Sequence, residues 1–286
     1  TNYRDISLRH PYPGWIENLN GPSGVVVGAG KGLLHVFCCK DTAKADMLPV
    51  DMAIDTLLAV AWETAVDRPE QVKVYNCSTY ENPTTWGEFE SALRLYLRGH
   101  PLDNAYWYPS GLAVENKIAH KSLETLLQTA PLHIAEYLTK LLGIKTRMSL
   151  ITVSQRLVAM SDVLKFFSMR EWHFKTDNVK KLHARLSPQD AAIYNLDPQT
   201  INWSNHYENF IKGTRKYLLQ EKDQDIDVAK KHLRKMYYVH QGLLLFVLAI
   251  LCRFALENQY IRAFVYRTFR MLLSILTAAY MRIQQS

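Results

Sequence analysis

The chain has 286 residues, enough to bury a sizeable core in one or two domains, and a formal net charge of +7 at pH 7. All of this excess lies from residue 226 onward, where nine Lys and Arg stand against Asp227 and Glu257. A basic tail suits nucleic acid or anionic lipid, and the apolar content of this one favours lipid. Four cysteines without chelating spacing and scattered histidines argue against a metal site and fit a reducing, cytosol-facing compartment.

Residues 1–105 have the pattern of an α/β domain. Short apolar runs predict strands at residues 25–27 and 72–76, and the apolar residues 50–62 predict a helix packed on a sheet. A second helix is predicted to start at Thr84. Its apolar positions recur every four residues, at Phe89, Leu93 and Leu97. A strand followed by a capped helix is the repeat of a doubly wound sheet, and this segment would be the last third of one.

The glycine-rich residues 21–32 have two interpretations. Gly28, Gly30 and Gly32 do not match the Gly-x-Gly-x-x-Gly spacing of a dinucleotide turn, and Lys31 is not followed by the Ser or Thr of a phosphate loop. The pattern favours a plain tight turn with positive φ over a stand-alone phosphate site.

Residues 106–225 are predicted to be mostly helical. Pro131 restarts a helix that Gly143 ends as a left-handed stop. Ser187, Pro188 and Asp190 combine the hydroxyl, the fixed φ and the early negative charge of a helix start. The apolar side of a later helix consists of Tyr207, Phe210, Ile211 and Leu218.

The tail, residues 226–286, contains two charge-free runs, 236–252 and 271–281. A bilayer span takes about 20 apolar residues, so both runs are short for one. Three alternatives remain: insertion as a hairpin or a marginal single span, an interfacial anchor, and an ordinary buried helix pair. Tyrosines at the start of the first run and the flanking Lys and Arg favour a membrane.

Several blocks in a fixed order resemble the animal, insect-like, fatty acyl-CoA reductase family. They are residues 11–31, 47–55, 74–78, 84–89, 158–174 and 186–197, followed by Ile201 to Trp203, Tyr207, Gly213, Arg215 and Tyr217. The resemblance covers roughly residues 8–220. Residues 1–7 depart from the family pattern, which has an apolar strand before the Pro-Gly-Trp block.

The resemblance implies an α/β fold followed by a mostly α fold. Residues 1–105 would be the remainder of an extended short-chain-dehydrogenase Rossmann domain, which binds NAD(P) and substrate. Residues 106–150 would be a helical connector, 151–225 the family's C-terminal helical domain, and 226–286 a basic, apolar, membrane-associating tail. The implied reaction reduces a long-chain acyl-CoA to the aldehyde and then to the fatty alcohol with two NADPH. It would take place on a cytosol-facing membrane of the endoplasmic reticulum or peroxisome.

The catalytic motif of that family is missing from this sequence. The resemblance implies a Tyr with a Lys four residues later, whose ammonium lowers the pKa of the phenol. No Tyr in this chain has such a Lys, and no Thr-Gly-x-x-Gly-x-x-Gly turn is present. We therefore expect no catalytic residue here and little turnover by this chain alone. We expect it to be the C-terminal half of a reductase whose N-terminal cofactor-binding region lies upstream.

The resemblance also implies a substrate side walled by Trp15, Gly28, Gly30 and Lys31. Lys31 would meet a CoA phosphate, and a solvated loop lysine is the alternative. An apolar acyl tunnel would be lined by Phe166, Phe167, Trp172 and Phe174, with core packing as the alternative. Tyr106, Trp107 and Tyr108 have two interpretations: they stack on an adenine or an acyl chain, or they form a packing cluster at the edge of a loop.

Two rival functions remain from the sequence. A non-catalytic membrane-anchored remnant would act as a lipid-binding or interaction protein. A sugar or sterol dehydrogenase relative would share only the Val-Asp and Tyr-Asn blocks, and the helical residues after 151 argue against it. The expected partners are long-chain acyl-CoA and membrane lipid, and no nucleic acid, while the sequence gives no oligomeric state.

Overall fold

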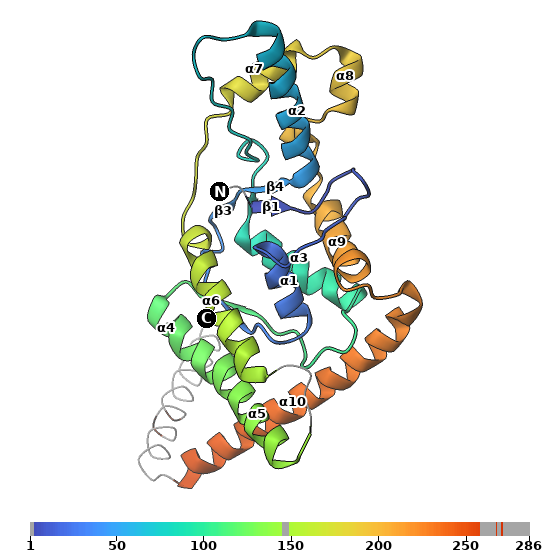
Figure 1. Ribbon diagram of the computed structural model, residues 1–286. Coiled ribbons are helices and arrows are strands. Elements are labelled where there is room, and N and C mark those ends of the chain that lie inside the picture. The colour runs from blue at the N-terminus through green and yellow to red at the C-terminus, as the bar shows by residue number, and fades with distance from the viewer. Residues whose placement is uncertain (1–2, 145–148, 258–266, 268–269, 271–286) are drawn as a thin grey trace, which may run out of the picture. The chain divides into compact units, whose positions relative to one another are not determined.

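A computed structural model describes residues 3–144 and 149–257, together with residues 267 and 270 (Figure 1). Contacts divide the chain into one unit of residues Thr1–Arg234 and a second of residues Lys235–Ser286. The sheets, the core and the candidate site described below all lie in the first unit.

The first unit is mostly helical. Its α-helices are α1 (Pro22–Gly30), α2 (Val50–Asp67), α3 (Trp86–Gly99), α4 (Lys117–Glu124), α5 (Ala130–Leu141), α6 (Leu150–Ser168), α7 (Asp177–Arg185), α8 (Pro188–Ile193) and α9 (Trp203–Gly213). Two π-helical turns, η1 (Thr125–Thr129) and η3 (Thr214–Leu218), join α4 to α5 and extend α9. The 3₁₀ turns are η2 (Pro198–Thr200) and η4 (Asp223–Asp225).

The strands of the described residues form three separate pairs. Strand β1 (Tyr3–Asp5) runs parallel to β4 (Met47–Pro49), with Tyr3 opposite Met47 and Asp5 opposite Pro49. Strand β2 (Val36–Phe37) runs parallel to β6 (Leu112–Ala113), and β3 (Lys44–Ala45) runs antiparallel to β5 (Thr84–Thr85). The doubly wound sheet expected from the sequence is thus represented in the described residues by short pairs, of which β1–β4 leads directly into α2.

Two predicted strands are wrong. Residues 25–27 lie inside α1, because Pro22 occupies its first turn, where the missing N–H and the fixed φ favour a helix. A short apolar run does not distinguish a buried strand from a buried helix, and here Val25 and Val26 are buried as helical residues. Residues 72–76 are irregular, and Val72 is 95% exposed.

Three predicted helix boundaries are confirmed to within a residue, whereas the helix predicted over residues 50–62 continues to Asp67. The Thr85 hydroxyl accepts from the backbone N–H of Glu88, while the Glu88 carboxylate accepts from that of Thr85, so a capping box starts α3. The Ser187 hydroxyl accepts from the backbone N–H of Asp190 at 3.1 Å and caps α8. Gly143, with φ +68°, follows the end of α5 as predicted.

The main core gathers apolar side chains from α1, α3, α6 and α9 around β1 and β4. Its buried members include Ile6, Val25, Val26, Met47, Trp86, Phe89, Leu93, Leu97, Leu102, Leu157, Leu164, Tyr207, Phe210 and Ile211. The predicted apolar faces of α3 and α9 are therefore both confirmed. A smaller core joins α2 to α7 through Ala59, Val179 and Leu182.

Helix α10 (Ile226–Glu257) begins in the first unit, where Ala229 and Leu233 are buried and His232 Nε2 lies 2.8 Å from the carbonyl oxygen of Ala105. Among the described residues one helical stretch, Asp223–Ala255, is long and apolar enough to cross a membrane, and its most apolar part is not buried at all. The first charge-free run is therefore helical throughout. The second run, residues 271–281, lies outside the described residues.

Candidate functional site

The carboxyl ends of β1 and β4 are the edge at which parallel α/β sheets usually bind ligands. Asp51, in the first turn of α2 and 6% exposed, organises the loop that follows β1. Its Oδ1 accepts from the N–H of Leu8 at 2.9 Å, and its Oδ2 accepts from those of Arg9 and His10 at 2.6 and 3.1 Å. One carboxylate thus fixes the path of the chain as it leaves the sheet.

Trp15 lies further along the same loop and is half-buried. Its N–H donates to the carbonyl of Tyr12 at 3.0 Å, and its carbonyl accepts from the N–H of Ser7 at 3.2 Å. Gly14 has φ +81°, and a Cβ there would lie 2.3 Å from the carbonyl oxygen of Asn209 on α9. The loop that carries Trp15 is therefore held by its own backbone and by α9, whereas the other three predicted substrate-side residues lie on or just after α1.

Gly28 and Gly30 are packing positions inside α1. A Cβ at Gly30 would lie 2.6 Å from the side chain of Leu102, and one at Gly28 would lie 3.2 Å from those of Leu157 and Leu34. Because leucine side chains fill the space beside both glycines, the two residues form no cradle for a phosphate. The residues present at this stretch do not fit the pyrophosphate of a dinucleotide.

The positive φ expected of a tight turn occurs at the two ends of α1 instead. Gly21, before the helix, has φ +59°, and Gly32, after it, has φ +66°. A Cβ at Gly32 would lie 2.1 Å from the carbonyl oxygen of Trp107, so the chain after α1 passes directly against the loop that follows α3. The interpretation of this stretch as a plain turn is correct at these two positions only.

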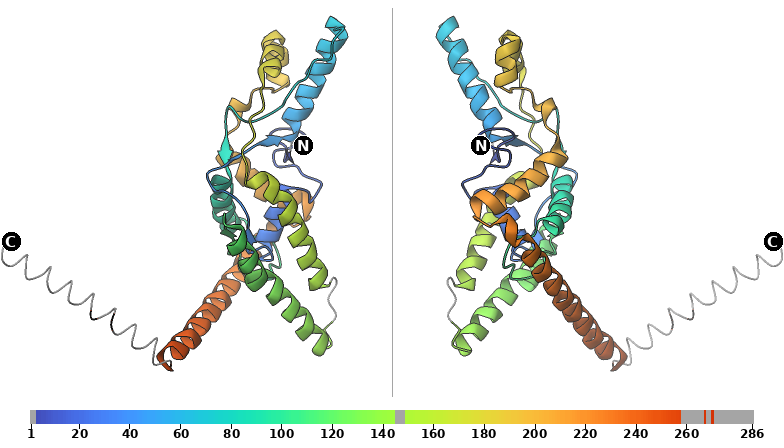
Figure 2. Two further views of the ribbon diagram at one scale, coloured as in Figure 1. Left: turned by 90° about the vertical axis from the view of Figure 1, so that its left-hand side faces the viewer. Right: turned by 90° about the vertical axis from the view of Figure 1, so that its right-hand side faces the viewer.

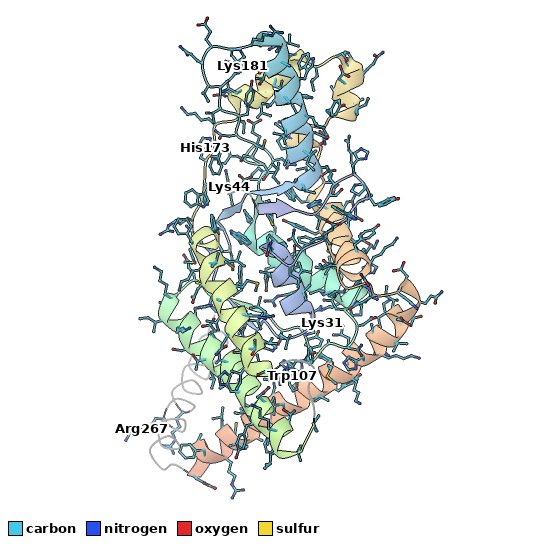
Figure 3. The ribbon with its side chains drawn as sticks, in the orientation of Figure 1. Lys31, Lys44, Trp107, His173, Lys181 and Arg267 are labelled. Carbon is cyan, nitrogen blue, oxygen red and sulfur yellow. The ribbon has the colours of Figure 1, made fainter. Side chains whose placement is uncertain are left out.

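Lys31 directly precedes Gly32 and forms an ion pair with Glu221, which is distant in the sequence. Its Nζ is 2.7 Å from Glu221 Oε1 and also donates to the carbonyl of Asp103, while its own carbonyl accepts from the N–H of Tyr106 at 2.8 Å. Figure 3 shows Lys31 at the end of α1, close to Trp107. The predicted contact of Lys31 with a CoA phosphate remains a prediction, and it would require the ammonium to share or leave Glu221.

Arg215 completes a buried charge network around Lys31. Its side chain is 1% exposed, and its guanidinium lies 3.2 Å from both Asp103 Oδ1 and Glu221 Oε2 and donates to the carbonyl of Pro101. Buried charges are retained when they are paired and hydrogen-bonded, as two cations and two carboxylates are here. The network ties the end of α1 to the loop after α3 and to η3.

An apolar cavity of about 180 Å³ lies between α1, α3 and the β2–β6 pair. Its apolar walls include Val25, Ala29, Val36, Phe37, Trp86, Phe89, Leu93, Leu97, Leu112 and Leu233. Polar groups at the cavity come from His35, Glu90, Arg94 and Arg98. Arg94 pairs with Glu90 and donates to the carbonyl of Gly111 at 2.7 Å, which fixes one cation at the cavity. An apolar space with a few convergent charges suits a hydrocarbon attached to a polar group.

The aromatic residues proposed to line a tunnel lie elsewhere. The rings of Phe166 and Phe167 are 5.1 Å apart and perpendicular, Trp172 packs on both, and Arg170 lies over Phe166. Phe166 is 48% exposed. None of Phe166, Phe167, Trp172 and Phe174 lines the 180 Å³ cavity, and none is among the residues of the buried cores. The first three form a partly exposed aromatic cluster at the end of α6, which is not the core packing that was the alternative.

Three of the four thiols are poorly placed to react, whereas Cys252 is free and exposed. Burial raises the pKa of Cys38, Cys39 and Cys77, which disfavours the thiolate that reacts. The part of the chain that the structure describes contains no group of three His, Cys, Asp or Glu side chains placed to hold a metal ion.

Sequence reasoning missed the polar residues of the cavity and the role of Asp51. Arg94 and Arg98 stand four residues apart, one position after the apolar Leu93 and Leu97, and this spacing is the only local signal for them. Asp51 lies inside the family block 47–55 and Arg215 follows the last block, but the resemblance assigns no role to either residue. Their roles depend on contacts with segments about 40 and 110 residues away, which no local pattern contains.

Comparison with known proteins identifies the family. The chain is 35% identical over 237 residues to "Fatty acyl-CoA reductase 1" of Mus musculus and 35% identical over 233 residues to "Fatty acyl-CoA reductase 2" of Bos taurus. These matches cover 82% and 81% of this chain but 46% and 45% of the relatives, so the chain spans about half the length of the curated relatives it matches. Two family models, both described as "Male sterility protein", match this chain. One of them, an NAD-binding model, matches residues 4–57, and the other matches residues 127–221. The chain therefore belongs to the fatty acyl-CoA reductase family.

Proposed function

We propose that this chain is a portion of an NADPH-dependent reductase that converts long-chain acyl-CoA to fatty alcohol, and that the chain alone is inactive. The observation that carries the proposal is the 35% identity to fatty acyl-CoA reductases over four-fifths of the chain. The absence of a Tyr-x-x-x-Lys pair, together with the leucine-filled spaces beside Gly28 and Gly30, supports inactivity of the isolated chain.

The apolar cavity between α1 and α3 is the proposed place for part of the acyl chain. Its 180 Å³ is comparable to an engineered cavity of about 150 Å³ that binds benzene, so it has room for a segment of a hydrocarbon chain. Each buried methylene contributes about 0.8 kcal/mol, so a short segment is sufficient for selectivity by chain length. Arg94 and Arg98 would then face the polar end of the substrate.

The exposed side of α2 supports the view that a further α/β layer completes the active enzyme. A stripe at helical spacing is exposed, formed by Ile54, Leu57, Leu58, Trp62 and Val66. Parallel sheets are normally covered on both faces and contain more than two strands, whereas β1–β4 is a two-stranded pair in the described residues. A sheet extended beyond β1 and packed on the α2 stripe would supply the glycine turn and the Tyr-x-x-x-Lys pair, which are not in this sequence.

The cavity assignment is tested with the full chain in detergent, using cis-parinaric acid as a fluorescent acyl probe. Ala29→Phe fills the cavity from α1, and Ala192→Phe, at an exposed position on α8, is the matched control. We expect Ala29→Phe to weaken probe binding at least tenfold and Ala192→Phe to leave it unchanged. Equal binding by both variants would remove the cavity from the proposal.

The reaction is tested by NADPH oxidation in the presence of palmitoyl-CoA. The chain alone is compared with the same chain joined to the part of the mouse reductase that lies outside the matched 237 residues. We expect fatty alcohol from the joined protein and none from the chain alone. Turnover by the chain alone would refute its inactivity, and binding of acyl probe without turnover in the joined protein would favour a lipid-binding remnant.

The tail supports a membrane location. Helix α10 carries the apolar run 236–252 directly after a basic stretch, which suits attachment to a cytosol-facing membrane of the endoplasmic reticulum or peroxisome. Fluorescence microscopy of the tagged chain beside markers of both organelles, with alkaline extraction of the membranes, tests this location.

A further inference from the structure

Helix α5 buries an acidic side chain and exposes apolar ones, which is the reverse of a helix whose polar face meets water. Its single fully buried side chain is Glu136, 4% exposed. The Glu136 carboxylate accepts from the backbone N–H of Leu150 at 2.7 Å and from the Ser149 hydroxyl at 3.2 Å, and it lies 3.1 Å from Lys140 Nζ. These bonds tie the acid inward against the start of α6. The helix therefore places its one acid inside and leaves Leu138 and Leu141 outside.

The outward residues form one continuous stripe, which we call the α5 stripe. From Ile134 to Leu142 its members recur at spacings of three and four residues, so that one face of α5 is apolar, and Leu126 in η1 and Ile144 in the following turn extend it at the two ends. Its members and their exposed fractions are Leu126 67%, Ile134 59%, Tyr137 69%, Leu138 47%, Leu141 71%, Leu142 70% and Ile144 55%. Contiguous exposed apolar surface of this kind marks a contact with another molecule or a membrane.

The charge around the α5 stripe distinguishes between a protein partner and a membrane. Residues 117–144 contain two acids, Glu124 and Glu136, and both are buried, at 1% and 4% exposed. The lysines that pair with them, Lys121 and Lys140, keep 63% and 69% of their side chains exposed. Residues 117–144 thus present an apolar and basic surface with no exposed carboxylate of their own, which complements anionic lipid headgroups.

We propose that the α5 stripe lies in the interfacial layer of a lipid bilayer, as a second membrane contact of this chain in addition to α10. Leucine and isoleucine side chains would enter the acyl boundary, while Tyr137 and the Lys140 ammonium would reach the headgroups, as amphipathic side chains do at such interfaces. The presence in the same chain of a helix able to cross a membrane makes a bilayer the expected neighbour. The inference does not depend on the proposed reductase activity.

The test uses the full chain reconstituted into vesicles of phosphatidylcholine with one-fifth phosphatidylserine. Cys77 and Cys252 are changed to Ser, and an NBD fluorophore is attached to a cysteine introduced by Leu141→Cys. The matched control is Ile193→Cys on α8, 60% exposed, which lies at the other end of the first unit from α5 in Figures 1 and 2. The readout is quenching of NBD by doxyl-labelled lipid.

We expect the label at 141 to lose at least half of its fluorescence to doxyl lipid and the label at 193 to lose less than a tenth. A variant that also carries Leu138→Glu and Leu142→Glu should reduce quenching at 141 to the level at 193. Equal quenching at 141 and 193 would overturn the proposal. So would a label at 141 that is blue-shifted but unaffected by doxyl lipid, because the stripe would then be covered by protein, either the chain's own tail or a second copy.

Discussion

The carboxylate of Asp51 holds three backbone N–H groups of the loop after β1, so its replacement by Asn tests how much that loop depends on it. An amide keeps one acceptor oxygen and turns an NH₂ group toward one or two of the three donors. A hydrogen bond to a charged group contributes about 1.5–3 kcal/mol. Because Arg9 and His10 are exposed and water can replace part of the loss, we expect a destabilisation of about 2–4 kcal/mol.

For a unit of this size, 1 kcal/mol corresponds to about 2–4 °C, so the expected fall in Tm is about 5–15 °C. The measurement is thermal unfolding of the full chain in detergent followed by near-ultraviolet circular dichroism. Asp223→Asn, at an exposed position, is the matched control and should change Tm by less than about 2 °C, as surface substitutions do. A Tm for Asp51→Asn equal to that of the control would refute the role assigned to this carboxylate.

Three further predictions concern packing, titration and reactivity. Gly213→Ala would place a Cβ 1.7 Å from the carbonyl oxygen of Gly14, at a cost of about 1–3 kcal/mol, and should lower Tm by about 2–12 °C in the same melts. Gly99→Ala, with open space around it, should leave Tm unchanged or raise it, and equal effects of the two substitutions would contradict the close contact. Burial lowers the pKa of His120, so on acidification the unfolded chain binds a proton at a higher pH than the folded chain does. The stability that neutral His120 contributes is therefore present above about pH 6.5 and is lost as the pH falls below that value. Tm should therefore fall between pH 7.5 and 5.5, and less steeply in His120→Gln; parallel slopes would exclude this histidine. Because burial raises the pKa of Cys38 and Cys39, Ellman's reagent at pH 8 should leave both unmodified in the native chain and modify them in guanidinium, and rapid modification of either in the native chain would show that its thiol is accessible.

Features with a local cause could be predicted from the sequence. The start of α3, the Ser187 cap of α8 and the end of α5 at Gly143 each follow from residues within a single turn. The apolar faces of α3 and α9 follow from periodicity, as the burial of Phe89 and Phe210 confirms. The family could be identified because its blocks are spread in order over most of the chain.

Features that depend on contacts between distant segments could not be predicted from the sequence. Residues 25–27 looked like a strand because three valines suit one, but burial between α3 and α6 and the preceding Pro22 decide for a helix. Gly28 and Gly30 looked like a turn, and the leucines that require them to be glycine come from residues 34, 102 and 157. The inward orientation of Glu136 depends on backbone N–H groups of another helix. The sequence pattern predicts that α5 is amphipathic, but it does not predict which face of the helix packs against the rest of the protein.

The contact between Gly14 and Gly213 has a consequence for how this family can diverge. Each residue faces the backbone of the other, and both already lack a side chain, so a larger residue at one position cannot be offset by a smaller residue at the other. The loop and α9 are therefore too close together for a Cβ at either position. Natural variation is expected to accumulate around these two positions while leaving them unchanged, or else to replace the whole loop at once.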